Sequence, residues 1–143
     1  MADCARRVAT DGVLWLVLRV YRALLVAGGG LVGSVARYWI AGWTQNWYGS
    51  GFPLGTLVVN LLGSFILGVV MTWSLERGLI GPEVRILLGT GFCGGFTTMS
   101  TFSYETMALV QYGGTTGALA NIALSLGGCL VSVWLGSLTA RIF

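Results

Sequence analysis

Apolar residues fill most of the chain in long runs, and charged residues interrupt these runs at few places. No ionisable side chain other than tyrosine or cysteine lies between Tyr38 and Leu75 or between Thr106 and Ala140. A helix that crosses a bilayer needs about 20 predominantly apolar residues. The pattern therefore predicts an all-α membrane protein with four crossings, at residues 23–43, 54–73, 84–112 and 119–138.

The first 20 residues do not fit a crossing, because Arg19 and Arg22 end the apolar run 13–18 too early. We expect residues 1–20 to be an extension of uncertain role, either an interfacial continuation of the first helix or a poorly ordered start. Residues 21–143 are then a single transmembrane domain. With four crossings, seven arginines share the side of the N-terminus and Arg37 lies on the other, which predicts a cytoplasmic N-terminus.

The composition supports a membrane protein and argues against other classes. Of 143 residues, 55% are hydrophobic and 9% are charged, whereas soluble domains carry about a quarter charged residues. The eight arginines are scattered, which argues against a nucleic-acid partner. The chain has no histidine, and it shows neither a nucleophile paired with a base nor a phosphate-binding loop, so an enzyme is not expected. The cysteines Cys4, Cys93 and Cys129 are too widely spaced for a metal-ligand pair, and we expect free thiols.

The third predicted crossing contains residues that favour a break in the helix. Four glycines and the pair Thr97-Thr98 lie at its centre, and all are poor helix formers. Backbone that leaves a helix deep in a bilayer marks an ion or substrate site in many transporters. The alternative is a glycine-rich helix that packs tightly, as the spacings Gly29/Gly33 and Gly91/Gly95 also suggest.

Neutral polar side chains form stripes on three of the predicted helices. With about 100° per residue, the stripe after the predicted break consists of Met99, Phe102, Ser103 and Thr106. The stripe on the second crossing consists of Thr56, Asn60 and Gly63. The stripe on the fourth crossing consists of Asn121, Ser125, Gly128 and Ser132. Lipid disfavours such stripes, so they face either a conduit or other helices through hydrogen bonds.

The predicted lining favours a small anion as cargo. Amide, hydroxyl and ring-edge hydrogens are electropositive, and none carries a fixed charge that would trap the ion. Arg37 can add a positive field at one mouth. Glu105 is the single carboxylate well inside a crossing, so a relay of several acids is not expected. Its role is either functional or that of an acceptor for neighbouring hydroxyls.

Four helices in a 15.1 kDa subunit are too few to surround a pore and also bury all of the polar stripes. We therefore expect two subunits. If two breaks meet at a symmetry axis, their freed carbonyl groups face each other and form a cage suited to a hard cation.

Three runs, residues 29–38, 55–65 and 91–105, resemble the Fluc/CrcB fluoride channels, and the likeness covers about residues 23–140. The resemblance implies a passive, fluoride-selective channel that exports fluoride across the bacterial inner membrane and lowers its intracellular concentration. It also implies an antiparallel, dual-topology homodimer of four-helix subunits with two pores. A structural sodium ion would lie at the dimer centre, held by the backbone carbonyls of Gly94 and Thr97.

The same resemblance assigns roles along the fluoride path. Asn60 matches the pore asparagine, Phe102 matches one of two pore phenylalanines, and Glu105 matches an acid near the pore. The hydroxyl track corresponds to Ser100, Thr101 and Ser103, and the stripes add Thr56 and Ser125 to the path. The sequence departs from the family at Met99, which replaces the other phenylalanine, so we expect altered conduction.

Two other functions are compatible with a small four-helix membrane protein. A small four-helix, proton-coupled multidrug or guanidinium exporter has a similar length, but it depends on a carboxylate in the first helix, where this chain has only Arg37. A membrane scaffold without transport leaves the polar stripes and the break unexplained.

Overall fold

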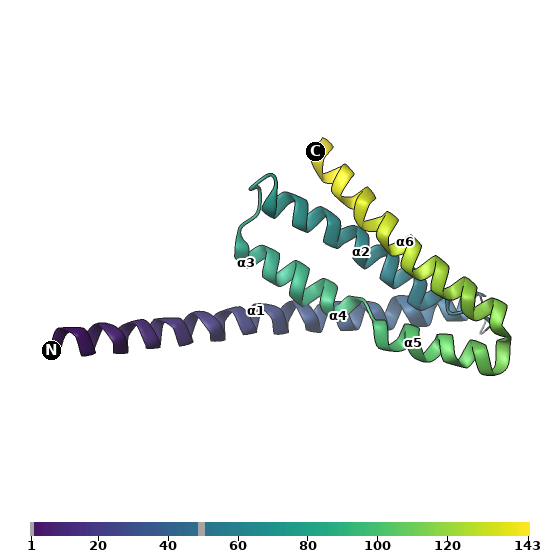
Figure 1. The fold of residues 1–143 in the computed structure, drawn as a ribbon, viewed down its shortest axis with the longest axis horizontal. Coiled ribbons are helices and arrows are strands. Elements are labelled where there is room, and N and C mark those ends of the chain that lie inside the picture. The colour runs from purple at the N-terminus through teal and green to yellow at the C-terminus, as the bar shows by residue number, and fades with distance from the viewer. Residues whose placement is uncertain (1, 49–50) are drawn as a thin grey trace.

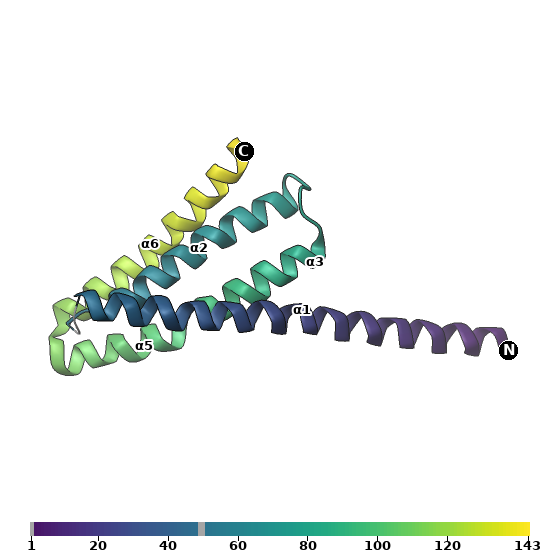
Figure 2. The same ribbon diagram turned by 180° about the vertical axis from the view of Figure 1, so that it is seen from behind.

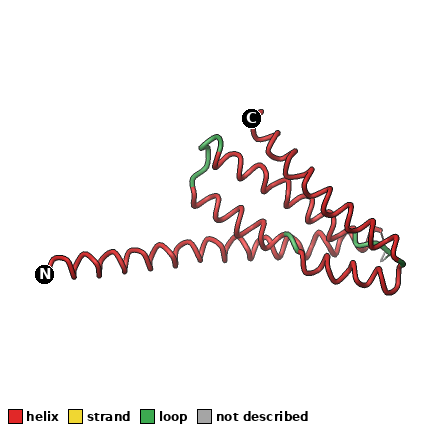
Figure 3. Tube along the Cα trace, viewed as in Figure 1, coloured by secondary structure: helices red, strands yellow, loops and turns green. Residues whose placement is uncertain are grey.

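A computed structural model describes residues 2–48 and 51–143, with side chains described outside residues 1–13, 45–50 and 113. Helices joined by short connections make up the described chain, as the tube in Figure 3 shows. Two segments, η1 and η2, have the wider hydrogen-bond pattern of a π-helix. The order is α1 (Ala2–Tyr48), α2 (Leu54–Leu75), α3 (Pro82–Arg85), η1 (Ile86–Cys93), α4 (Gly94–Phe96), α5 (Met99–Ala108), η2 (Leu109–Gly113) and α6 (Thr115–Ile142).

Proline and glycine mark most of the helix boundaries. Pro53 precedes α2, and Pro82 occupies the first position of α3, where its missing N–H costs nothing. Gly78 follows α2 with φ +62°, and Gly114 separates η2 from α6 with φ +86°. Both φ values lie in the left-handed region that favours glycine, so these two residues allow the chain to reverse direction.

Three helical segments are long and apolar enough to cross a membrane, among the residues that the structure describes: Leu14–Thr44, Leu54–Leu75 and Thr115–Ile142. The segment from α3 to η2 lies between two of them but is divided into two pieces. Large apolar side chains such as Leu31, Leu119 and Leu130 are well exposed, as expected for side chains that contact lipid. The protein is therefore a multi-pass membrane protein.

Helices α2 and α6 run obliquely to α1, with the segment from α3 to α4 between them (Figures 1 and 2). Helices α2 and α6 lie side by side, and α1 crosses η1 and α4 (Figures 1 and 2). The C-terminus and the connection between α2 and α3 lie close together, where Arg141 forms an ion pair with Glu76 at 2.8 Å. Helix α1 continues as one rod well past this bundle, so the described residues of the extension are helical.

Glycines set the closest approaches between helices. A Cβ atom on Gly33 would overlap the carbonyl oxygen of Phe92, and one on Gly95 would lie 2.9 Å from the Cα of Gly30. Gly68 and Gly136 play the same part between α2 and α6. The packing expected from the spacings Gly29/Gly33 and Gly91/Gly95 is confirmed for Gly33 and Gly95.

The helical path of the third segment is interrupted at two threonines. Helix α4 ends at Phe96, Thr97 and Thr98 are extended with ψ values of 158° and 113°, and α5 begins at Met99. The four glycines of this segment stay within helical structure, and two of them, Gly91 and Gly95, contact α1. The interruption thus falls after the glycines.

Candidate functional site

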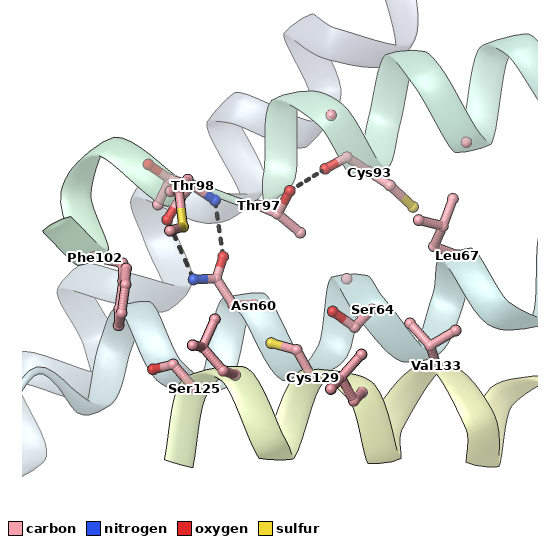
Figure 4. A pocket seen from close by; sticks show the side chains of 16 residues that line it. Asn60, Ser64, Leu67, Cys93, Thr97, Thr98, Phe102, Ser125, Cys129 and Val133 are labelled. Carbon is pink, nitrogen blue, oxygen red and sulfur yellow. Dashed lines mark hydrogen bonds between the residues drawn. The ribbon is translucent and has the colours of Figure 1, made fainter. Parts of the chain in front are cut away.

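A groove of about 590 Å³ lies between α2, α6 and the interrupted segment (Figure 4). Its wall is mostly apolar with a few polar groups, and none of the 16 residues that line it carries a formal charge. They are Asn60, Gly63, Ser64, Leu67, Gly89, Cys93, Gly94, Thr97, Thr98, Met99, Phe102, Ser125, Leu126, Cys129, Leu130 and Val133. An uncharged groove of this kind can hold or pass a small ion or molecule only through hydrogen bonds and shape.

The side chain of Asn60 reaches from α2 to the interruption. Its Nδ2 donates to the carbonyl oxygen of Thr98 at 3.2 Å, and its Oδ1 accepts from the Thr98 N–H at 2.8 Å. Figure 4 shows the two bonds side by side. The amide therefore pairs with extended backbone as a neighbouring strand would, and it satisfies polar groups that the hydrocarbon could not. The second N–H of Nδ2 is still available to a ligand.

The start of α5 is capped by its own side chains. Thr98 Oγ1 accepts from the backbone N–H of Thr101 at 3.2 Å, which is the usual bond of an N-cap threonine. The same hydroxyl lies 3.2 Å from Ser100 Oγ and 3.0 Å from Thr101 Oγ1. Three hydroxyls thus form one cluster at the helix start, with Ser100 and Thr101 on the exposed side.

The interruption also changes the hydrogen bonds of the preceding turn. Cys93 O accepts from both the backbone N–H and the hydroxyl of Thr97, each at 2.9 Å. In a continuous helix, the carbonyl of Gly94 would accept from the N–H of Thr98, but that N–H donates to Asn60 instead. A Cβ atom on Gly94 would meet nothing within 4 Å, so the backbone there borders open space.

Met99 and Phe102, both predicted to lie on the fluoride path, differ in exposure. Phe102 is 6% exposed and lies across the groove from Ser125 (Figure 4). Met99 also lines the groove but is 65% exposed. Ser103 is exposed and donates to the carbonyl oxygen of Met99, so the predicted common face of Met99, Phe102, Ser103 and Thr106 is only half buried.

A buried hydrogen-bond chain supports the groove from behind. Ser125 Oγ lies 3.4 Å from Asn121 Oδ1, and Asn121 Nδ2 donates to Thr106 Oγ1 at 2.9 Å. The Thr106 hydroxyl donates in turn to the carbonyl oxygen of Phe102 at 2.7 Å. Asn121 is 1% exposed, so its bonds form in a low-dielectric interior. The polar stripe of the fourth crossing therefore serves helix packing at Asn121 and the groove at Ser125.

Six predicted site residues lie outside the wall of the groove: Arg37, Thr56, Ser100, Thr101, Ser103 and Glu105. The hydroxyl of Thr56 lies against the carboxyl group of Glu105, whose Oε2 is buried without a hydrogen-bond partner among the described residues. Arg37 is half-buried on α1 and does not line the groove. The structure thus brings together Asn60, Gly94, Thr97, Met99, Phe102 and Ser125, and it places Ser100, Thr101 and Ser103 on the exposed side of α5.

The sequence-based site omitted several residues of the wall. Ser64 follows Asn60 by one helical turn, and Cys129 follows Ser125 by one turn, so the stripes could have been extended to both. Thr98 could have been recognised as an N-cap residue before a new helix. The free thiols of Cys93 and Cys129 agree with the prediction, whereas the side chain of Cys4 lies outside the described residues.

Sequence comparisons place the chain among known proteins. The family described as "CrcB-like protein, Camphor Resistance (CrcB)" matches residues 24–137. A relative from Geobacter metallireducens, named fluoride-specific ion channel FluC, is 49% identical over 112 residues, which is 78% of this chain and 90% of the relative. Relatives of the same name from Geotalea uraniireducens and Anaeromyxobacter sp. are 44% and 45% identical, over 82% and 84% of this chain and 95% of each relative. The chain therefore belongs to the CrcB-like family.

Proposed function

We propose that this protein is a passive, fluoride-selective channel that exports fluoride and lowers its concentration in the cytoplasm. The observation that carries the proposal is the uncharged groove beside the interrupted helix, in a chain whose relatives are named fluoride-specific ion channels. A channel of this kind catalyses no reaction.

The chemistry of the groove supports an anion. The second N–H of Asn60 and the ring edge of Phe102 offer positive hydrogen to the groove without a full charge, and Ser125, whose hydroxyl donates to Asn121 Oδ1 at 3.4 Å, adds a neutral polar group to the wall. Fluoride is the smallest halide and the strongest hydrogen-bond acceptor among them, so it gains most from such donors. The absence of a fixed positive charge on the lining residues keeps binding weak enough for the ion to leave.

The proposal includes a second copy of the chain. Ser100, Thr101 and Ser103 lie exposed on α5, on a segment that we place within the bilayer. Their hydroxyls are bonded to Thr98 and to the Met99 carbonyl, and their remaining lone pairs face a surface where lipid offers no donors. An antiparallel homodimer covers this face and closes the groove into two pores. In this arrangement the third crossing comprises α3 to η2, each subunit crosses four times, and the two interruptions meet near the membrane midplane.

The backbone at the interruption also fits a structural sodium ion. The carbonyl of Gly94 lacks its helical donor, because the N–H of Thr98 donates to Asn60 instead, and a Cβ atom on Gly94 would meet nothing within 4 Å. Carbonyl oxygens are suitable ligands for a hard cation, so Gly94 and Thr97 from each subunit would hold it. The ion would supply positive charge that offsets the repulsion between facing carbonyl dipoles. The chain's own contribution is to fix the direction of those carbonyls through the bonds of Asn60 and Thr97.

The other transporter class has less support. A proton-coupled multidrug or guanidinium exporter needs a carboxylate in its first helix, and residues 14–44 contain none. The remaining membrane carboxylate, Glu105, lies against Thr56 and outside the groove wall. The proposal includes a location in the bacterial inner membrane, with the lipid bilayer as its surroundings, and the apolar helices and the bacterial relatives support it.

The test uses the purified full chain reconstituted in liposomes loaded with the potassium salts of fluoride and chloride, with valinomycin added so that potassium can leave as counter-ion. Ion-selective electrodes follow the release of each halide. We expect rapid release of fluoride and retention of chloride. Equal release of both halides, or release of neither, contradicts the proposal.

A further inference from the structure

The N-terminal part of α1 projects beyond the helical bundle. The family match begins at residue 24, and the rod continues away from the other helices before that point (Figures 1 and 2). Channel function in this family therefore does not explain residues 14–22, whose side chains the structure describes.

Residues 14–22 expose large apolar side chains around most of the helix. Leu14, Trp15, Leu16 and Val17 are 55–59% exposed, and Val20 is 53% exposed. Water disfavours a helix with so much apolar surface, so this segment needs an apolar contact.

Two arginines occupy one stripe of the same segment. Trp15, Arg19 and Arg22 follow one another at i, i+4 and i+7, which aligns them on one face. The Arg19 guanidinium lies 3.7 Å from the centroid of the Trp15 ring, a cation–π contact. Tryptophan and arginine are typical of the headgroup region, where a flat ring and a long charged side chain bridge apolar and polar layers.

The length of α1 also places this segment at the bilayer surface. The apolar stretch Leu14–Thr44 has 31 residues, or about 46 Å of helix, against a hydrocarbon core of about 30 Å. Arg19 and Arg22 limit the crossing on the N-terminal side, since neither has an acidic partner among the described residues that would allow it into the core. The excess therefore lies at residues 14–22.

We propose that residues 14–22 are a membrane-surface anchor that binds anionic phospholipid. The apolar side chains enter the boundary of the acyl region, and Arg19 and Arg22 bind headgroup phosphates. Residues 1–22 carry four arginines against two aspartates, so the charge complements an anionic leaflet. Arg19 stacked on Trp15 is held in place to meet the phosphate.

The first experiment measures the depth of the segment in liposomes that contain phosphatidylglycerol. A nitroxide is attached to Val17→Cys in the full chain with its native cysteines replaced by alanine. Reference labels at Leu31→Cys and Leu79→Cys report a lipid-facing position within the crossing and the exposed connection after α2. We expect a depth between the two references. A label as accessible to aqueous nickel as that at Leu79, or one whose motion is as restricted as that of a label buried between protein helices, overturns the anchor.

The second experiment tests the lipid class by native mass spectrometry of the full chain with phosphatidylglycerol or phosphatidylcholine. We expect R19Q/R22Q to bind at least threefold less phosphatidylglycerol than the unchanged protein and to bind the same amount of phosphatidylcholine. R19K/R22K should retain most of the binding, and R85Q, at a basic position outside the anchor, should have little effect. Equal loss in R85Q, or no loss in R19Q/R22Q, contradicts the proposal. Neither readout depends on fluoride transport.

Discussion

Asn60 and Thr98 are joined by two hydrogen bonds, in which one side-chain amide both donates to and accepts from the backbone of a residue 38 positions away. The pair has two consequences at once. It satisfies the extended backbone at the interruption, and it takes from Gly94 the N–H that a continuous helix would supply. The interruption and the freed carbonyl therefore have a common cause.

Replacing Asn60 by alanine should weaken both the fold and transport. Two lost hydrogen bonds at about 1 kcal/mol each, with backbone groups left unsatisfied, predict a loss of about 2–3 kcal/mol. We expect a lower thermal midpoint in detergent and at least a tenfold slower fluoride efflux. Ser64→Ala removes a hydroxyl from the same groove one turn along α2 and is the matched control. Similar losses of stability and efflux in both variants would show that the Asn60–Thr98 hydrogen bonds contribute no more than an ordinary polar group of the groove.

Glycine should be required at Gly33 and dispensable at Gly28. A Cβ atom on Gly33 would overlap the Phe92 carbonyl oxygen, whereas one on Gly28 would meet nothing within 4 Å. Gly33→Ala must force α1 away from η1, which we expect to cost about 1–3 kcal/mol as overpacking does. Gly28→Ala should leave the thermal midpoint unchanged or slightly raised. Equal stability of the two variants would contradict the close crossing.

Met99→Phe should raise the rate of fluoride efflux. Met99 lines the groove but has no electropositive ring edge to offer an anion, and its 65% exposure leaves room for the larger ring. Met107→Phe makes the same change at a similarly exposed position of α5 that does not line the groove. Rates measured by fluoride electrode should rise only for Met99→Phe. An unchanged rate would mean that an aromatic edge at this position is unimportant.

Asn121→Leu should destabilise the protein more than a change on the lipid-facing side of α6. The substitution removes the donor to Thr106 and the acceptor near Ser125 in a site that is 1% exposed, so we expect a loss of about 1–3 kcal/mol. Leu124→Ala alters an exposed side chain of the same helix and should cost less. Denaturation in detergent compares the two, and a larger loss in Leu124→Ala would contradict the buried chain of hydrogen bonds.

Local chemistry made the helices predictable. Pro53 and the charged connection after Leu75 delimit α2, whose bounds lie within two residues of the predicted 54–73. Helix α6 extends beyond the predicted 119–138 at both ends, because a helix continues past the apolar core into the interface. For residues 1–20 the sequence allowed either a continuation of the first helix or a poorly ordered start. In the structure, the described part of this extension continues α1.

Tertiary contacts explain what the sequence left open. The glycines near the centre of the third segment and the two threonines were equally plausible sites for the interruption. Close contact with α1 keeps Gly91 and Gly95 helical, whereas the amide of Asn60 holds Thr98 extended. The partner of Thr98 lies on another helix, and no local pattern identifies it. The buried chain through Asn121 depends in the same way on the packing of α5 against α6.

The most direct test of passive anion conduction through this protein is the dependence of fluoride efflux on a counter-ion path. Liposomes loaded with potassium fluoride are diluted into a potassium-poor buffer at constant pH, and valinomycin is added while an electrode records fluoride. We predict little efflux before valinomycin and a rapid burst after it, because a channel moves net charge. Full release without valinomycin, at a rate that changes in a parallel run with an imposed pH gradient, would indicate proton-coupled transport and contradict the account.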